Sequence, residues 1–238
     1  MKAPRNADCE TLNRRFGVPG RIVFRPSKHD APIVVLANQY GSAEVALFGA
    51  QTLSYRPTGN PPVLYLPHPY DETPAGAEIH GGIPVCWPWF ARCGPAGSKL
   101  HGVARYARWR VTGSEYSEDV TEVTLALESD AETRKAWPHD FALELKVSVS
   151  MKLTLALRAT NTGTEAFHVT EGFHPYFLVR ERDQTEVLGV DGWRHFVCVE
   201  PCSTPDEAGY DLKPGESHDL LMAVQSVPND GSVHARHP

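Results

Sequence analysis

The sequence predicts an all-β protein built as a large antiparallel β-sandwich. Apolar and polar residues alternate with a period of two along most of the chain, which is typical of half-buried strands. The alternating segments are short, and Gly, Asn or Pro closes most of them. Only residues 130–138 are helix-like, and Pro138 limits that helix. Because the 238 residues are 41% hydrophobic, we expect one sandwich domain over residues 1–238.

The alternation predicts a strand in each of several short segments, which are residues 21–26, 31–38, 43–57, 108–117 and 122–129. The clearest signal is a hairpin formed by residues 141–150 and 152–163, joined by a polar turn near Ser150–Lys152. The apolar side chains expected on one face of this hairpin are Phe141, Leu143, Leu145, Val147, Val149, Leu153, Leu155 and Leu157.

Charge and composition limit the classes of partner. The formal net charge of −6 and the pI near 6.0 argue against a broad surface for nucleic acid or anionic membrane. Residues 1–17 contain no apolar signal-peptide core, and no run approaches the ~18 apolar residues of a membrane span. Five cysteines without framework spacing predict free thiols in a reducing cytoplasm. We therefore expect a cytoplasmic protein that holds a small molecule in a local pocket.

The first stretch that breaks the strand pattern is "IHGGIPVCWPWFARCG", residues 79–94. It combines one His with two Trp, one Phe, two Pro, three Gly and two Cys. Gly81 and Gly82 permit backbone conformations, or a close ligand approach, that a side chain would block. Two interpretations stay open for this stretch: an apolar wall of a binding site, or a rigid crossover loop buried for structural reasons.

The second stretch is "KLHGVARYARW", residues 99–109, which places His101 and Arg105 four residues apart beside an aromatic residue. The guanidinium of Arg105 could make a forked contact to a carboxylate or a phosphate. The alternative is a surface arginine that pairs with one of the many acidic residues.

Two further stretches supply titratable groups. In "EGFHPYF", residues 171–177, His174 precedes a proline and is therefore expected in an extended segment. In "HFVCVEP", residues 195–201, alternation places Glu200 at the end of an apolar strand. Partial desolvation there would suit the carboxylate to general-base work. The alternative is a glutamate that simply turns to solvent.

The cysteines favour neither a metal site nor a thiol nucleophile. Cys198 and Cys202 have a spacing that fits no compact zinc pattern, so no metal is predicted. Cys86 and Cys93 lie in an apolar stretch poor in acidic residues, with no evident base beside them.

Taken together, these stretches resemble the hexose-6-phosphate mutarotases, also called glucose-6-phosphate 1-epimerases, of the galactose-mutarotase-like superfamily. The motifs that carry the resemblance are "LNRRFG", "ALFGAQTLSY", "HGGIPVCWPWF", "LHGVARYARW", "WPHDF", "FHPYF", "FVCVE" and "LKPGESH". The resemblance implies a large antiparallel β-sandwich. It also implies an isomerase that interconverts α and β anomers of a sugar by opening and reclosing the hemiacetal ring, without cofactor or metal.

The resemblance also implies roles for particular residues. His174 of "FHPYF" would be the acid and Glu200 of "FVCVE" the base. The implied substrate-binding residues are His80, His101, Arg105, Trp87 and Phe90. Among them, His101 would hydrogen-bond the sugar and Arg105 would meet a phosphate, while the two aromatic rings would line the sugar pocket. Separately from the resemblance, we expect Lys99 to help Arg105 with a phosphate.

Two differences from the family pattern stand out. The family usually has Arg immediately before the paired glycines, whereas this chain has His80, a shorter and weaker cation. Between "FHPYF" and "FVCVE" the family carries several more strands and an Asp that helps to position the sugar. Here residues 178–194 run directly to the second motif, and Asp191 cannot be equated with that Asp.

These differences leave three functions open: a mutarotase, a non-catalytic homologue that binds a sugar or sugar phosphate, and a structural role. Loss of strands would also leave an unpaired sheet edge, which predicts a homo-oligomer.

Overall fold

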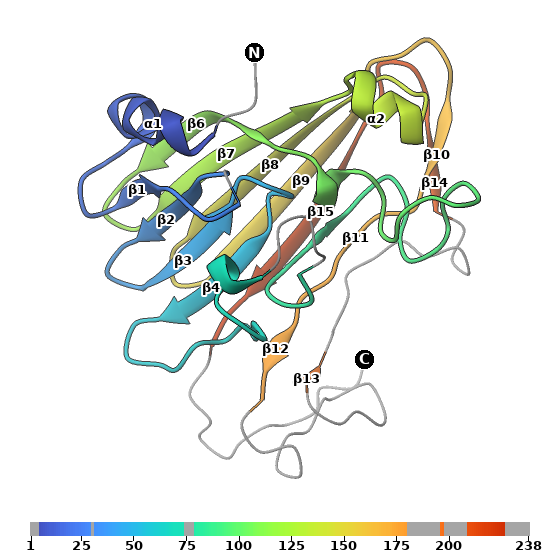
Figure 1. The fold of residues 1–238 in the computed structure, drawn as a ribbon. Coiled ribbons are helices and arrows are strands. Elements are labelled where there is room, and N and C mark those ends of the chain that lie inside the picture. The colour runs from blue at the N-terminus through green and yellow to red at the C-terminus, as the bar shows by residue number, and fades with distance from the viewer. Residues whose placement is uncertain (1–4, 30, 74–78, 180–195, 198–208, 227–238) are drawn as a thin grey trace.

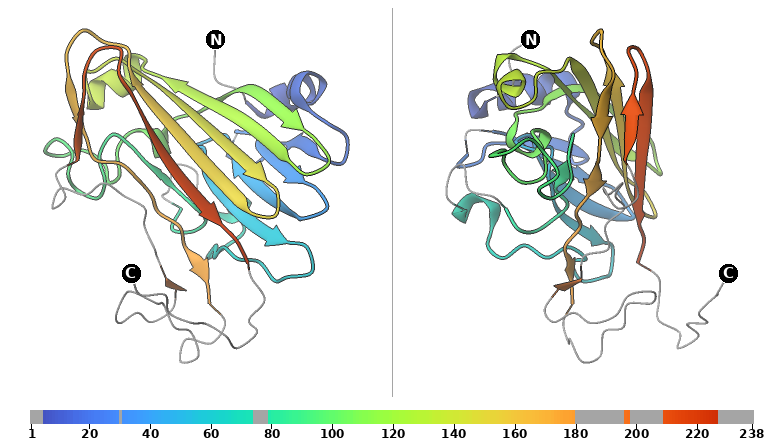
Figure 2. Two further views of the ribbon diagram at one scale, coloured as in Figure 1. Left: turned by 180° about the vertical axis from the view of Figure 1, so that it is seen from behind. Right: turned by 90° about the vertical axis from the view of Figure 1, so that its right-hand side faces the viewer.

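The computed structural model describes residues 5–29, 31–73, 79–179, 196–197 and 209–226. Within these ranges the chain folds into two antiparallel β-sheets that lie face to face, with a set of short strand pairs at one side (Figure 1). The views in Figure 2 show the two sheets as separate layers. The predicted all-β sandwich is therefore confirmed.

The first sheet has the strand order β1-β2-β3-β4. Its strands are β1 (Ile22–Arg25), β2 (Ile33–Ala37), β3 (Gly41–Ala46) and β4 (Thr52–Pro57). The segment predicted as one strand over residues 43–57 is thus two strands. The chain reverses between them, where Gly49 and Ala50 have φ angles of 72° and 49° in the left-handed region.

The second sheet has the order β15-β9-β8-β7-β6, so that β15 and β6 are its outer strands. Its strands are β6 (Arg110–Tyr116), β7 (Thr121–Glu128), β8 (Phe141–Val149), β9 (Leu153–Asn161) and β15 (Ser217–Val224). The predicted hairpin is confirmed as β8 and β9, which pair from Phe141 opposite Asn161 to Val149 opposite Leu153. All eight apolar side chains predicted on its inner face are buried.

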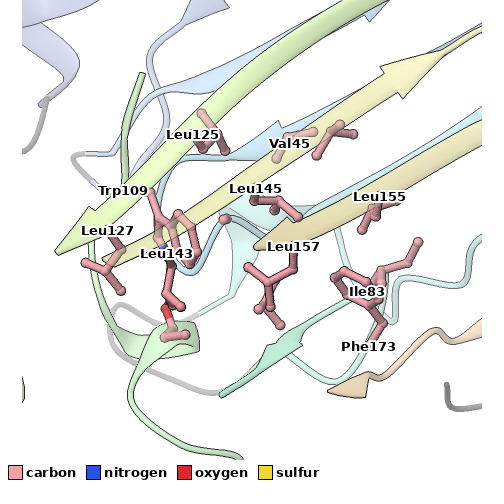
Figure 3. Close-up of a cluster of buried hydrophobic side chains, with 14 of the residues drawn as sticks. Val45, Ile83, Trp109, Leu125, Leu127, Leu143, Leu145, Leu155, Leu157 and Phe173 are labelled. Carbon is pink, nitrogen blue, oxygen red and sulfur yellow. Dashed lines mark hydrogen bonds between the residues drawn. The ribbon is translucent and has the colours of Figure 1, made fainter. Parts of the chain in front are cut away.

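The main hydrophobic core lies between the two sheets. Figure 3 shows leucines of β7, β8 and β9 in this core, with Ile83 and Phe173 among the side chains near them. A second, smaller core covers the outer face of the first sheet; its buried members are Ile33, Ala46, Leu53, Tyr70 and Ile79. The outer face of the second sheet carries ion pairs, such as Arg158 with Asp219 at 2.8 Å. The outer face of the first sheet is therefore covered in part, at β2, β3 and β4, whereas the second sheet is covered on one face.

Two α-helices accompany the sheets. Helix α2 (Ala131–Ala136) lies within the predicted segment, and it begins where Oδ1 of Asp130 accepts the N–H groups of Glu132 and Thr133 at 2.9 and 2.8 Å. Pro138 follows soon after its end.

Helix α1 (Cys9–Phe16) was not predicted, so the expectation of a single helix was wrong. This helix buries only Cys9 and Leu12, and eight residues give little periodicity to recognise. The sequence did carry an electrostatic signal for this helix. Glu10 lies in the first turn and two arginines lie in the last turn, where each charge complements the helix dipole.

Three short strand pairs join distant parts of the chain beside the sandwich. They are β5 (Val85–Cys86) with β11 (Gly172–Phe173), β10 (Phe167–Val169) with β14 (Tyr210–Leu212), and β12 (Phe177–Leu178) with β13 (Phe196–Val197). Three single-turn helices complete the described elements: η1 (Asn6–Asp8), η2 (Tyr70–Glu72) and η3 (Ala104–Tyr106).

No helix in the described ranges is long and apolar enough to cross a membrane. The single domain over residues 1–238 and the homo-oligomer both stay predictions.

Candidate active site

The stretch from residue 79 to 94 forms a closely packed wall rather than an open loop. Gly82 has a φ of 62°, and a Cβ atom there would lie 2.2 Å from the carbonyl oxygen of Thr52 on β4. At Gly102, in the second predicted stretch, a Cβ atom would lie 1.9 Å from the carbonyl oxygen of Trp87. These glycines therefore allow backbone segments to approach one another.

Trp87 supports this wall from the core. Its side chain has no exposed surface, and its ring packs against those of Trp137 and Phe141, with centroids 5.1 and 4.5 Å away. The placement of Trp87 therefore favours a role in supporting the wall over the predicted contact with a sugar. Phe90, three residues later, meets the predicted site histidines directly.

Four rings from three segments form the centre of the candidate site. The ring of His174 lies between those of Phe90 and Tyr176, nearly parallel to both, with centroids 6.1 and 4.7 Å away. The ring of His101 stands edge-on to Phe90 at 5.0 Å and to His174 at 5.2 Å. The structure therefore brings together three of the predicted residues, Phe90, His101 and His174.

The backbone fixes the ring of His101. The N–H of Ala91 donates to Nδ1 of His101 at 3.1 Å, and the N–H of His101 donates to the carbonyl of Ala91 at 3.0 Å. Because Nδ1 accepts a hydrogen bond, the proton of the neutral imidazole lies on Nε2. His101 can therefore offer an N–H donor to a hydroxyl group of a ligand.

The segment of His174 is tied along the wall. The N–H of His174 donates to the carbonyl of Pro84 at 3.1 Å, and the N–H of Tyr176 donates to that of Gly82 at 2.8 Å. The hydroxyl of Thr170 accepts the N–H of Phe90 at 3.0 Å. The predicted extended conformation around His174 agrees with this pairing.

Sequence reasoning missed two residues of this arrangement, Thr170 and Tyr176. Tyr176 is buried, and its hydroxyl lies 3.5 Å from Nδ1 of His80, which is exposed. A period-two reading of residues 170–176 would have grouped Thr170 and Tyr176 with His174, since all three occupy even-numbered positions of this extended segment.

Arg105 lies on η3 and is not the surface arginine of the alternative interpretation. Only 6% of the residue is exposed, and its Nη2 atom is buried without a hydrogen-bond partner among the described residues. The guanidinium carbon lies 5.6 Å from the ring centre of Tyr106. A buried guanidinium with an unused donor is suited to an anionic ligand.

Glu200 and Asp191 lie outside the described residues. Strand β13, at residues 196–197, pairs antiparallel with β12, at residues 177–178. The segment that leads toward Glu200 in the sequence therefore runs beside the strand that follows His174.

Neither thiol nor metal chemistry is indicated by the described residues. Cys9, Cys86 and Cys93 form no disulfide with one another, and Cys86 is fully buried. Within the described ranges, no group of three or more His, Cys, Asp and Glu side chains is arranged to hold a metal ion. A broad cavity of about 1260 Å³ lies beside residues 95–103, but neither His101 nor His174 lines it.

Comparisons with known proteins identify the family of this chain. The family model described as aldose 1-epimerase matches residues 32–193, which is more than half of the chain. The chain therefore belongs to the aldose 1-epimerase family.

Two similar proteins carry a more specific name than that of the family. The chain is 31% identical over 186 residues to a protein of Salmonella typhimurium named "Putative glucose-6-phosphate 1-epimerase", covering 75% of this chain and 61% of that protein. A protein of the same name from Escherichia coli is 32% identical, covering 71% of this chain and 56% of that protein. The chain thus spans about three fifths of the length of these relatives.

Solved structures agree with the fold. A crystal structure described as a "putative mutarotase" from Salmonella typhimurium matches with a TM-score of 0.59 and 31% identity, covering 71% of this chain and 57% of that one. The Slr1438 protein of Synechocystis matches with a TM-score of 0.67 over 79% of this chain and 93% of its own, and at 19% identity it supports the fold alone.

Proposed function

We propose that the protein is an aldose 1-epimerase that interconverts the α and β anomers of a hexose 6-phosphate. The observation that carries this proposal is the placement of His174. Its imidazole stacks with two aromatic rings, 5.2 Å from the ring of His101, between β11 and β12, and β12 pairs with β13 in the segment that leads to Glu200. Family membership supports the same reaction type.

The reaction needs two proton transfers on opposite sides of the anomeric carbon. Glu200 removes the proton of the anomeric hydroxyl while His174 donates a proton to the ring oxygen, so that the C1–O5 bond breaks and an open-chain aldehyde forms. After rotation about C1–C2, the hydroxyl at C5 attacks the other face of the aldehyde and both protons return. No net charge or redox equivalent is exchanged, and the chain's own side chains account for every proton.

The remaining site residues orient the sugar. Nε2–H of His101 donates to a sugar hydroxyl, and the ring of Phe90 provides an apolar surface for one face of the sugar. The buried guanidinium of Arg105 takes the phosphate, with Lys99 as a second cation nearby in the sequence. His80 stands where the family has Arg, and its link to Tyr176 places it at the rim of the same cluster.

A sugar-binding homologue without catalysis is the second candidate, because the chain covers only 61% of the first relative's length. Two-dimensional exchange NMR on α-glucose 6-phosphate, with glucose and galactose alongside, separates the two functions. We expect the protein to accelerate exchange between the anomers of glucose 6-phosphate well above the buffer rate. Binding without acceleration for all three sugars would support the homologue instead. A cytoplasmic location stays a prediction from the cysteine content.

A further inference from the structure

Behind the candidate site lies a second cluster of titratable residues that the proposed reaction does not use. Glu171 precedes His174 by three residues and has only 1% of its surface exposed. Nδ1 of His218, on β15, donates to Oε1 of Glu171 at 2.8 Å. The ring of Tyr210, on β14, stacks on that of His218 with centroids 4.0 Å apart.

The two faces of residues 170–174 have different partners. Thr170 and His174 meet Phe90 in the wall of the site. Glu171 and Phe173 alternate with them and point the other way. Phe173 lies in the main core near Ile83 (Figure 3), and Glu171 reaches β15 of the five-stranded sheet. The segment is therefore held from both sides.

Because Glu171 is buried, its hydrogen bond with His218 is energetically important. A carboxylate removed from water is costly unless a charged or strongly donating partner compensates it. Oε1 accepts the hydrogen bond of His218, and the phenol of Tyr210 interacts with the same carboxylate, so compensation depends on these two residues of β14 and β15. Residue 171 can therefore keep its position at low cost only while β15 lies beside it.

The charges around the pair favour the ionised form. The hydrogen bond to Glu171 raises the pKa of His218 above its ordinary value of 6.5, and the carboxylates of Glu171 and Asp219 act in the same direction. Burial, followed by the charge of Glu171, raises the pKa of Tyr210 well above its usual range, so the phenol stays neutral. Asp219 is itself paired with Arg158 on the outer face of the sheet.

We propose that the Glu171–His218 pair is a positioning device for the site: it braces residues 170–174 against β15 and so fixes His174 and Thr170 against the wall. Its catalytic consequence rests on the proposed function, whereas its effect on the backbone does not. Glu171 and His218 touch no reacting atom in this proposal. They act through the backbone of residues 170–174, which carries His174.

The chain offers a matched control in a second histidine–carboxylate pair. Nδ1 of His168, on β10, lies 2.9 Å from Asp211 on β14, close to the 2.8 Å of the buried pair. The side chains of His168 and Asp211 are 56% and 73% exposed, whereas that of Glu171 is 1% exposed. Exposed pairs contribute little, so the control has the same chemistry without the burial.

The test uses amide hydrogen exchange in the full-length protein without substrate. Glu171→Gln and His218→Gln should each accelerate exchange of the Phe90 and His174 amides about tenfold or more. The Phe90 amide bonds to Thr170 of the braced segment, and the His174 amide ties that segment to Pro84 in the wall. Asp211→Asn and His168→Gln should change it less than about twofold. The exchange of these two amides should also rise with pH in the wild type beyond the intrinsic rate, as His218 loses its proton, and not in Glu171→Gln.

Activity provides the second readout. Glu171→Gln and His218→Gln should lower kcat for anomerisation about tenfold with little change in KM, and the double variant should lie closer to wild type than the product of the single effects, because paired amides restore a neutral hydrogen bond. If Glu171→Gln does not fold, His218→Gln, whose side chain is 42% exposed, carries the test. Equal exchange rates in the buried-pair and control variants would overturn the brace, even where the wild type is active. An inactive wild type with the expected exchange pattern would overturn only the proposed function.

Discussion

The five-stranded sheet and the wall of the candidate site are built in opposite ways. Strands β8 and β9 pair over nine residues each, and their inner side chains form a continuous apolar face. The candidate site, by contrast, combines this wall with two-residue strands, a left-handed turn at His101 with a φ of 61°, and rings from three separate segments. The difference teaches that stability and proposed chemistry reside in separate parts of the molecule, which substitutions can separate.

The largest effect is expected at His174 in the candidate site. His174→Asn keeps a polar side chain of similar reach but removes the acid, so the anomerisation rate should fall by on the order of 10²–10⁴. The free energy of unfolding should change by less than about 1 kcal/mol, because His174 is only partly buried and lies outside the hydrophobic core. Exchange NMR and urea denaturation measure the two quantities.

The control for this variant is His168→Asn, which changes the same residue type at an exposed position. Its rate should match that of the wild type. Loss of stability in His174→Asn in proportion to its loss of rate would show that the wall and the sheet are not separable.

The converse substitution lies in the sheet. Leu145 on β8 has no exposed surface, and Leu145→Ala should lower the free energy of unfolding by about 2–5 kcal/mol through lost burial and the cavity left behind. Urea denaturation measures this loss, and the rate per folded molecule should stay near that of the wild type. Leu221→Ala, at a position 64% exposed on β15, should change stability by about 0.5 kcal/mol or less.

A smaller effect, specific to one class of substrate, is expected at η3. Arg105→Ala removes the buried guanidinium and should weaken binding of glucose 6-phosphate roughly ten- to a hundredfold, since a charge-assisted hydrogen bond contributes about 1.5–3 kcal/mol. Binding of glucose should change much less. Calorimetry with both sugars measures the difference, and Arg158→Ala on the outer sheet face is the control. Equal losses for both sugars would remove Arg105 from the phosphate site.

The smallest expected effect is a pH dependence of the free energy of unfolding. It arises at His218 on β15 of the sheet, which bonds to Glu171 in the segment of the candidate site. The pKa of His218 is raised in the folded state, so its contribution is complete below its ordinary value of 6.5 and is lost as pH rises through the raised value. Because the imidazole is partly exposed, we expect a loss of about 1 kcal/mol or less above that range. Urea denaturation from pH 6 to 9 should show this loss in wild type, and a flatter profile in Glu171→Gln. A flat wild-type profile would mean that the pair does not favour the charged histidine.

The sequence predicted the sheet better than the wall for a physical reason. Alternation over residues 141–149 reports directly on a face that is buried by one neighbouring layer, so β8 and β9 could be assigned strand by strand. The reversal inside residues 43–57 was not predicted, because a left-handed turn at Gly49 and Ala50 leaves the apolar pattern almost unbroken.

The site could be predicted only in part. The motif resemblance named Phe90, His101 and His174, which the structure brings together, and it also named Trp87, whose ring lies in the core. The link between Glu171 and His218 joins residues 47 positions apart, and no local pattern reveals such a contact. Glu200 lies outside the described residues, so its role stays a prediction.

The central claim is that His174 and Glu200 act as one proton-transfer pair, and a double-mutant cycle on the anomerisation rate tests it most directly. His174→Asn and Glu200→Gln should each slow anomerisation of α-glucose 6-phosphate by on the order of 10²–10⁴. The double variant should be little slower than either single variant, because half of a proton relay contributes little alone. Near-normal turnover in either single variant, or losses that multiply in the double variant, would contradict the account.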